Sequence, residues 1–170
     1  MAAEGFSYRM RPATVQDTGA VRQLAGTTLS HPEGKGRREG HRAAAQRGEL
    51  LLLERYDGRL QDWRVCAFVE WHIRVDDVLT IRDVGTEGDS PHPGMAKQLL
   101  MELMRSLTPA QAAIKVRTDA TEWNQIIRSI AGFMLEGTEY RRPSWFNVWQ
   151  WTRESAAEAA RSGRGSRFRP

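Results

Sequence analysis

A short loop between a predicted strand and a predicted helix carries the residues whose types and spacing most directly suggest chemistry, the binding of an anion. The loop is rich in turn-forming residues: Gly85, Gly88, Asp89, Ser90, Pro91, Pro93 and Gly94. The first N–H groups of a helix have no partner within the helix and carry partial positive charge, so this arrangement favours a bound phosphate. The same residues are also typical of the start of an ordinary surface helix.

The elements that must position this loop are a mostly buried strand before it and an amphipathic helix after it. The strand pattern covers Val78 to Val84, with the charges of Arg82 and Asp83 interrupting the apolar residues. The helix pattern runs from Met95 to Leu107, with Met and Leu side chains at helical spacing. The sequence therefore predicts a strand, a loop and a helix between residues 78 and 107.

The rest of the chain alternates short strand and helix patterns with turn signals. Strands are expected over Tyr8–Arg11, Glu49–Arg55, Trp63–Arg74, Ala113–Thr118, Phe133–Tyr140 and Trp145–Thr152. Helices are expected after a capping box at Thr14–Asp17, over Arg37–Arg47, from Thr121 to a stop at Gly132, and over Ser155–Arg161. This order predicts a mixed α+β domain with one central sheet of about six to seven mostly antiparallel strands and about four flanking helices.

Length and composition restrict the class of protein. A chain of 170 residues suits one domain, and no apolar run approaches the length that spans a membrane. The first residues lack the apolar core of a signal peptide, so the sequence predicts a cytoplasmic protein without membrane contact. The single cysteine, Cys66, lies among apolar residues and is expected in the core, and none of the four histidines has the spacing of a metal ligand. No metal is expected.

The positive charge is concentrated at the C-terminus. The chain has a net charge of +4, and its last ten residues hold four arginines and no acid. Without these four, 21 basic residues balance 21 acidic ones. We expect residues 154–170 to form the short helix and a disordered Arg/Gly/Ser-rich tail, either simply solvated or in weak contact with nucleic acid or an acidic partner.

The order and punctuation of these elements resemble the GNAT superfamily of acyl-CoA-dependent N-acyltransferases. The resemblance covers residues 1–153, most clearly from Tyr8 to Arg153. YRMRPATVQDTGAVRQL is similar to the family's opening strand and helix, LLLERYDGRLQDWRVCAFVEW to its strand pair, and IAGFMLEG to its "GF" segment. The resemblance implies the GNAT fold, acetyl-CoA as co-substrate and an amine acceptor, either a small molecule or a protein, in a monomer or homodimer.

The resemblance also implies where coenzyme A binds. The family signature of Arg or Gln, two residues, Gly, one residue, then Gly or Ala falls on Pro91 to Ala96, with the small residues matched and Pro91 in place of Arg or Gln. The implied coenzyme A contacts are Val84, Gly85, His92, Gly94, Met95, Ala96 and Lys97, with Asn124 and Arg128 from the following helix. Arg128 occupies the position at which many members carry a tyrosine that protonates the leaving thiolate.

Acyl transfer to an amine requires a base, polarisation of the carbonyl and a proton for the departing sulfur. We expect the base to be Glu70 or Asp83, with His72 and Asp77 behind them, and Tyr140 is the candidate acid in place of the missing tyrosine. An alternative is a degenerate GNAT-fold module that binds or assembles without catalysis, as the proline-containing loop and Arg128 suggest. The sequence leaves the acceptor undefined.

Overall fold

The computed structural model describes residues 6–24, 29 and 38–165. The strands are β1 (Tyr8–Pro12), β2 (Leu50–Asp57), β3 (Asp62–Ile73), β4 (Val78–Thr86), β5 (Gln111–Arg117), β6 (Phe133–Arg141) and β7 (Ser144–Thr152). The helices are α1 (Thr18–Gln23), α2 (Arg38–Gln46), α3 (Pro93–Leu107), α4 (Thr121–Ser129) and α5 (Arg153–Gly165), and a single 3-10 turn, Val15–Asp17, precedes α1.

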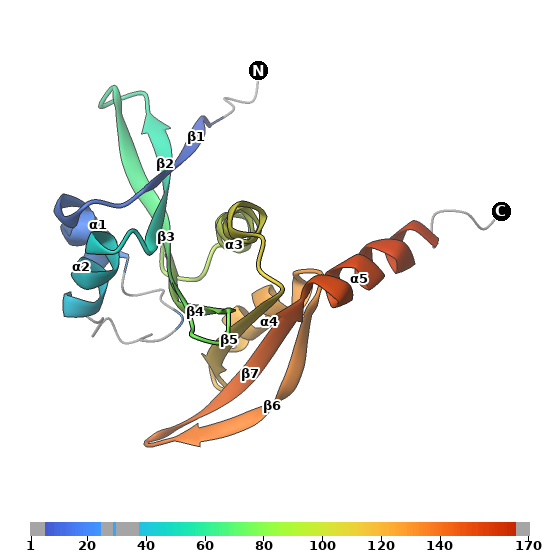
Figure 1. Cartoon of the computed structure of the whole chain (residues 1–170). Coiled ribbons are helices and arrows are strands. Elements are labelled where there is room, and N and C mark those ends of the chain that lie inside the picture. The colour runs from blue at the N-terminus through green and yellow to red at the C-terminus, as the bar shows by residue number, and fades with distance from the viewer. Residues whose placement is uncertain (1–5, 25–28, 30–37, 166–170) are drawn as a thin grey trace.

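The seven strands form one sheet in the order β1-β2-β3-β4-β5-β7-β6. Every neighbouring pair is antiparallel except β4 and β5, which are parallel because α3 makes the crossover between them. Helices α1 and α2 lie on one face of the sheet, and α3 and α4 lie on the other (Figure 1). The α+β class, the mostly antiparallel seven-stranded sheet and the order of its elements are therefore confirmed.

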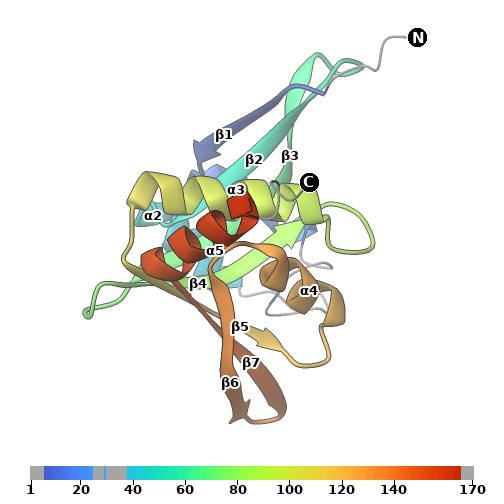
Figure 2. The same cartoon turned by 90° about the vertical axis from the view of Figure 1, so that its right-hand side faces the viewer.

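The sheet divides between β4 and β5. The two strands pair only from Val78 opposite Gln111 to Ile81 opposite Ile114, although β4 continues to Thr86 and β5 to Arg117. They begin side by side and then run apart, with α4 near their open ends (Figure 2). We call this division, formed by residues 82–86 and 115–117, the fork.

A bulge in the β3–β4 ladder lies at the start of the fork. Glu70 is opposite Asp83 and Trp71 is opposite Ile81, which leaves Arg82 as the additional residue. As a result, the side chains of Ile81 and Val84 both enter the core beneath α3 and α4, and Asp83 lies beneath α2.

The core has two parts, one on each face of the sheet. The larger part lies between the sheet and α3 and α4, and it contains the Cys66 side chain, which is fully buried. The Cys66 thiol donates to the Leu53 carbonyl at 3.3 Å, and burial raises the pKa of the thiol to about 12. The expectation of a core cysteine is confirmed.

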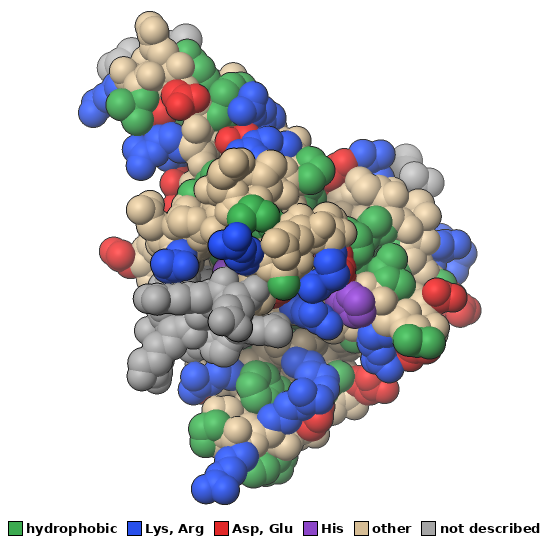
Figure 3. Space-filling model, turned by 60° about the vertical axis from the view of Figure 1, so that its left-hand side comes forward, with side chains coloured by type: hydrophobic (Ala, Val, Ile, Leu, Met, Phe, Trp, Pro, Cys, Tyr) green, Lys and Arg blue, Asp and Glu red, His purple; other side chains and the backbone are tan. Residues whose placement is uncertain are grey.

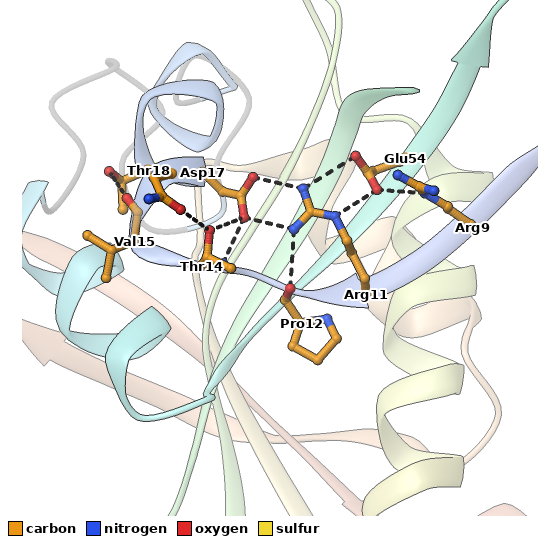
Figure 4. A network of polar contacts seen from close by, with 9 residues as sticks. Arg9, Arg11, Pro12, Thr14, Val15, Asp17, Thr18 and Glu54 are labelled. Carbon is orange, nitrogen blue, oxygen red and sulfur yellow. Dashed lines mark hydrogen bonds and ion pairs between the residues drawn. The ribbon is translucent and has the colours of Figure 1, made fainter. Parts of the chain in front are cut away.

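A charged network fixes β1 against β2 and the first helical turn (Figure 4). The buried Glu54 carboxylate accepts from Arg9 at 2.9 Å and from Arg11 at 2.8 Å. Arg11 also makes two 2.8 Å bonds to Asp17, and Asp17 accepts from the Thr14 N–H at 2.7 Å, as the predicted capping box requires. The Arg11 hydrogen bonds lower the pKa of Asp17 from 3.8 to about 2.

The C-terminal region differs from the prediction in the length of its helix. Helix α5 continues to Gly165, beyond the expected end at Arg161, and residues 166–170 of the expected tail lie outside the described residues. Of the tryptophans that alternate along β7, Trp149 is buried in the core, but Trp145 is 55% exposed. Trp145 lies at the tip of the β6–β7 hairpin, beyond the cover of α4, and packs against Tyr140 with ring centroids 5.3 Å apart. Among the described residues, no helix is long and apolar enough to cross a membrane.

Candidate functional site at the fork

The N-terminus of α3 lies at the end of the loop that follows β4, as the sequence predicts. His92 is the N-cap, and its Nδ1 accepts from the Met95 N–H at 3.1 Å. The His92 N–H donates to the Thr86 hydroxyl at 2.9 Å, which ties the helix start to the end of β4. Gly94 gives the imidazole room, since a Cβ at this position would be 3.3 Å from His92 Cε1.

A pocket of about 390 Å³ lies beside this helix start. Its lining comes from the loop, from the first turns of α3 and from the outer face of α4: Ser90, Pro91, Pro93, Lys97, Glu122, Gln125, Ile126 and Ser129. Pro93 has no N–H, and the Met95 N–H is already bonded to His92. An anion in this pocket would therefore meet the Ser90 hydroxyl and the Lys97 ammonium rather than a full ring of helix N–H groups, and the carboxylate of Glu122 also lines the pocket.

Val84 and Gly85 lie on the arm of the fork that belongs to β4. The Val84 N–H donates to Asp83 Oδ1 at 3.0 Å, and the Val84 carbonyl accepts from the Leu29 N–H at 2.9 Å. Gly85 is required by close packing, because a Cβ here would be 2.3 Å from Phe68 Cε1. Both expected contacts are thus at the fork, and both backbone polar groups of Val84 have partners within the protein.

The two predicted base candidates are brought together beneath α2. Glu70 and Asp83 are cross-strand partners in β3 and β4, and they are 1% and 0% exposed. His41 of α2 completes this cluster, and no local pattern predicts it, because the contact depends on how α2 packs on the sheet. His41 Nε2 lies 3.4 Å from Asp83 Oδ2, and its ring packs edge-on against Phe68 at 5.0 Å.

The residues expected behind this cluster have other partners. His72 Nδ1 lies 2.6 Å from Glu49, which also accepts from Arg47. Burial disfavours the ionised Glu49, but the bonds from Arg47 and His72 outweigh it and lower the pKa of Glu49. Asp77 lies in the β3–β4 turn with a φ of 62°. His72 thus belongs to the ion pair with Glu49, and Asp77 belongs to the turn.

Asn124, an expected coenzyme A contact, joins α4 to the sheet instead. Its Nδ2 donates to the carbonyls of Arg117 at 2.9 Å and Ala120 at 3.0 Å. Its Oδ1 accepts from Asn147 Nδ2 and from Trp149 Nε1, each at 2.9 Å. These four bonds occupy both donors and both lone pairs of the amide, so the structure gives Asn124 a structural role.

The remaining predicted site residues are spread over the surface. Arg128 is exposed at the end of α4, and it is not among the residues that line the pocket at the helix start. Tyr140 is 53% exposed at the tip of the β6–β7 hairpin, and in the sheet order β5 and β7 separate its strand from β4. The structure therefore does not bring Tyr140 to the Glu70 and Asp83 cluster. Among the described residues, no group of three His, Cys, Asp or Glu side chains is arranged to hold a metal ion.

No family model and no curated protein sequence matches this chain. Solved structures do match it. A GNAT-family acetyltransferase from Bacillus cereus has a TM-score of 0.66 and 10% identity, over 86% of this chain and 97% of that one. YncA from Salmonella typhimurium, solved with its cofactor acetyl-CoA, has a TM-score of 0.64 and 12% identity, over 86% and 94%. AAC(6')-Ib, in complex with ribostamycin and coenzyme A, has a TM-score of 0.64 and 11% identity, over 88% and 95%. The chain thus has the fold of the GNAT acetyltransferases, as its resemblance to that superfamily implied.

Proposed function

We propose that this protein is an N-acetyltransferase that moves the acetyl group of acetyl-CoA to a primary amine of a small molecule or a protein. The observation that carries the proposal is the fork between β4 and β5, with the start of α3 at the end of the β4 arm. We expect two strands that separate after four paired residues to admit the acyl-CoA chain in a slot between them. The solved neighbours that hold acetyl-CoA or coenzyme A have the same fold.

The residues present at the fork fit an acyl-CoA in two places. The pyrophosphate would lie in the pocket beside α3, where Lys97 supplies a cation and Ser90 a hydroxyl. The pantetheine arm would follow β4 along Val84 and Gly85, into the slot. In this binding mode Val84 exchanges its bonds to Asp83 and Leu29 for bonds to the ligand.

The chemistry then needs few protein groups. The amine nitrogen attacks the thioester carbonyl carbon, a C–N bond forms, the C–S bond breaks, and one proton leaves the nitrogen. Glu70 and Asp83 are the base candidates, and His41 beside Asp83 is a positioning residue for that carboxylate. The Val84 N–H, once released from Asp83, would polarise the carbonyl. We assign no acid to the departing sulfur, because Tyr140 lies elsewhere.

A second candidate function is a non-catalytic GNAT-fold module that binds a partner. Three observations favour it: both backbone groups of Val84 are partnered, the Met95 N–H is capped by His92, and Pro93 has no N–H. Each one lowers the number of backbone groups ready to receive acyl-CoA. Nucleic-acid contact through the basic tail belongs to this second candidate.

Titration calorimetry with acetyl-CoA, followed by an amine panel, separates the two candidates. The enzyme proposal predicts binding that weakens in Lys97→Gln and is retained in Arg105→Gln, which removes an exposed cation from the last turn of the same helix. It also predicts release of free coenzyme A thiol when an amine is added. No heat at millimolar acetyl-CoA would refute the proposal, and tight binding without turnover on any amine would favour the module.

A further inference from the structure

A basic groove lies on the face of the sheet opposite α3 and α4, directly at the fork. Its volume is about 620 Å³, within the range of about 300–1,000 Å³ typical of small-molecule sites. The lining comes from β4, β5, β7 and the ends of β3 and β6: Arg74, Thr80, Ile81, Arg82, Ala113, Lys115, Arg141 and Phe146. We call it the basic groove. Lys and Arg side chains are numerous on this side of the molecule, below and to the right of the grey atoms in Figure 3.

The basic groove is adjacent to the slot in which the proposed reaction takes place. Thr80 and Ile81 belong to the last paired residues of β4, and Arg82 is the bulge residue at which the fork opens. Bulges commonly redirect a side chain next to an active site. Ala113 and Lys115 lie on the facing strand, one residue to each side of Ile114, where pairing ends. A molecule in the groove would therefore have one end at the fork.

The lining of the groove is basic. Four of its eight lining side chains are cations, and none is a carboxylate. Two carboxylates beside it offset part of this charge: Glu139 accepts from Lys115 at 2.6 Å and from Arg141 at 3.0 Å, and Asp76 accepts from Arg74 at 2.7 Å. These pairs are solvent-exposed and hold their partners weakly, so Lys115, Arg141 and Arg74 remain available to a ligand.

The floor of the groove adds a polar group that lacks a partner. The Thr80 hydroxyl oxygen is buried, and it has no hydrogen-bond partner among the described residues. A ligand acceptor that lies in the groove over Thr80 would satisfy this hydroxyl after a small side-chain movement. Phe146 supplies the apolar wall that a short aliphatic chain needs.

From these observations we infer that the acyl acceptor is a small amine with an anionic group, a carboxylate or a phosphate, at its other end. The amine lies at the fork, and the anion lies over the cations of the basic groove, where Arg guanidinium groups suit both anions. This inference rests on the proposed acetyl transfer and adds the chemical class of the acceptor.

Matched pairs of amines test the inference. The phosphate arm compares 3-aminopropyl phosphate with 3-amino-1-propanol, and the carboxylate arm compares 4-aminobutyrate with butylamine. With saturating acetyl-CoA, we expect kcat/KM for at least one anionic amine to exceed that of its neutral partner about tenfold or more, because charge-assisted contacts form only with the anion. The arm with the larger ratio identifies the anion. Equal values in both arms would overturn the inference.

Variants test whether the cations of the basic groove cause this preference. In the double variant Lys115→Gln and Arg141→Gln the ratio is expected to fall to about threefold or less, while Arg105→Gln, which removes an exposed arginine of α3, leaves it unchanged. Circular dichroism confirms that each variant is folded.

Calorimetry with 3-aminopropyl phosphate or 4-aminobutyrate alone, without acetyl-CoA, should detect binding that weakens as salt is raised. If acetyl-CoA does not bind but an anionic amine does, the proposed function fails and the groove assignment stands. Absence of binding by both anionic amines overturns the inference, whether or not an RNA oligonucleotide binds instead.

Discussion

Replacing Asn124 by alanine should destabilise the protein without weakening acetyl-CoA binding to the folded state. The substitution removes four side-chain hydrogen bonds: three join α4 to β5 and β7, and the fourth is donated to the carbonyl of Ala120 at the start of α4. Ala120 O keeps a partner in the Asn124 N–H of the helix, but the Trp149 indole N–H is left buried, in a residue that is 5% exposed. An unsatisfied buried donor together with the net loss of the other bonds amounts to about 3 kcal/mol.

This loss is measured by urea unfolding and by thermal unfolding. For a chain of this size, about 3 kcal/mol corresponds to a fall in Tm of about 6–12 °C. Gln98→Ala, at an exposed position of α3, is the control and should change stability by no more than about 0.5 kcal/mol. A decrease of less than about 1 kcal/mol in the free energy of unfolding of Asn124→Ala would refute the structural role. So would a tenfold weaker acetyl-CoA affinity at unchanged stability, which would indicate that Asn124 contacts coenzyme A.

Three further predictions follow from packing, ion pairing and burial. Gly85→Ala should lower the free energy of unfolding by about 1–3 kcal/mol, since the new Cβ meets Phe68 at 2.3 Å; unchanged urea unfolding would contradict the packing at the fork. Because Arg11 lowers the pKa of Asp17 from 3.8 to about 2, the stability from this pair is present above about pH 4 and is lost as the pH falls towards 2. Asp17→Asn should flatten that part of the stability profile, and identical profiles for wild type and variant would refute the assignment. The Cys66 thiol, fully buried and with its pKa raised to about 12, should resist an aromatic disulfide reagent in the native state and react once urea unfolds the chain, whereas rapid native reaction would contradict its burial.

Alternation and turn residues were sufficient to predict the elements of this fold. Strand β2 ends at Asp57, directly before Gly58. Gly132, with a φ of +100°, follows α4 and precedes β6. Strand β5 begins at Gln111, two residues before the predicted start at Ala113. The reason is tertiary, because the extra residues pair with Val78 and Leu79 of β4.

The sequence predicts only those parts of the candidate site that lie within one continuous segment of the chain. The local sequence predicts that a helix begins after β4, and it places Val84 and Gly85 on the strand just before that loop. Asn124 was expected at coenzyme A, but its role depends on Asn147 and Trp149, which only the β5–β7 pairing brings near it.

The basic groove depends in the same way on distant segments. Arg82 and Lys115 stand out in their strands as charges among apolar residues, and this is the signal that sequence alone offers. Only the parallel pairing of β4 and β5, and the position of β6, place them on one face with Arg141.

Hydrogen–deuterium exchange with and without acetyl-CoA tests most directly whether acyl-CoA binds at the fork. If it binds there, backbone exchange slows in residues 82–97, which cover the β4 arm of the fork and the start of α3. Exchange that is unchanged there at saturating acetyl-CoA, or protection confined to other segments, would contradict it.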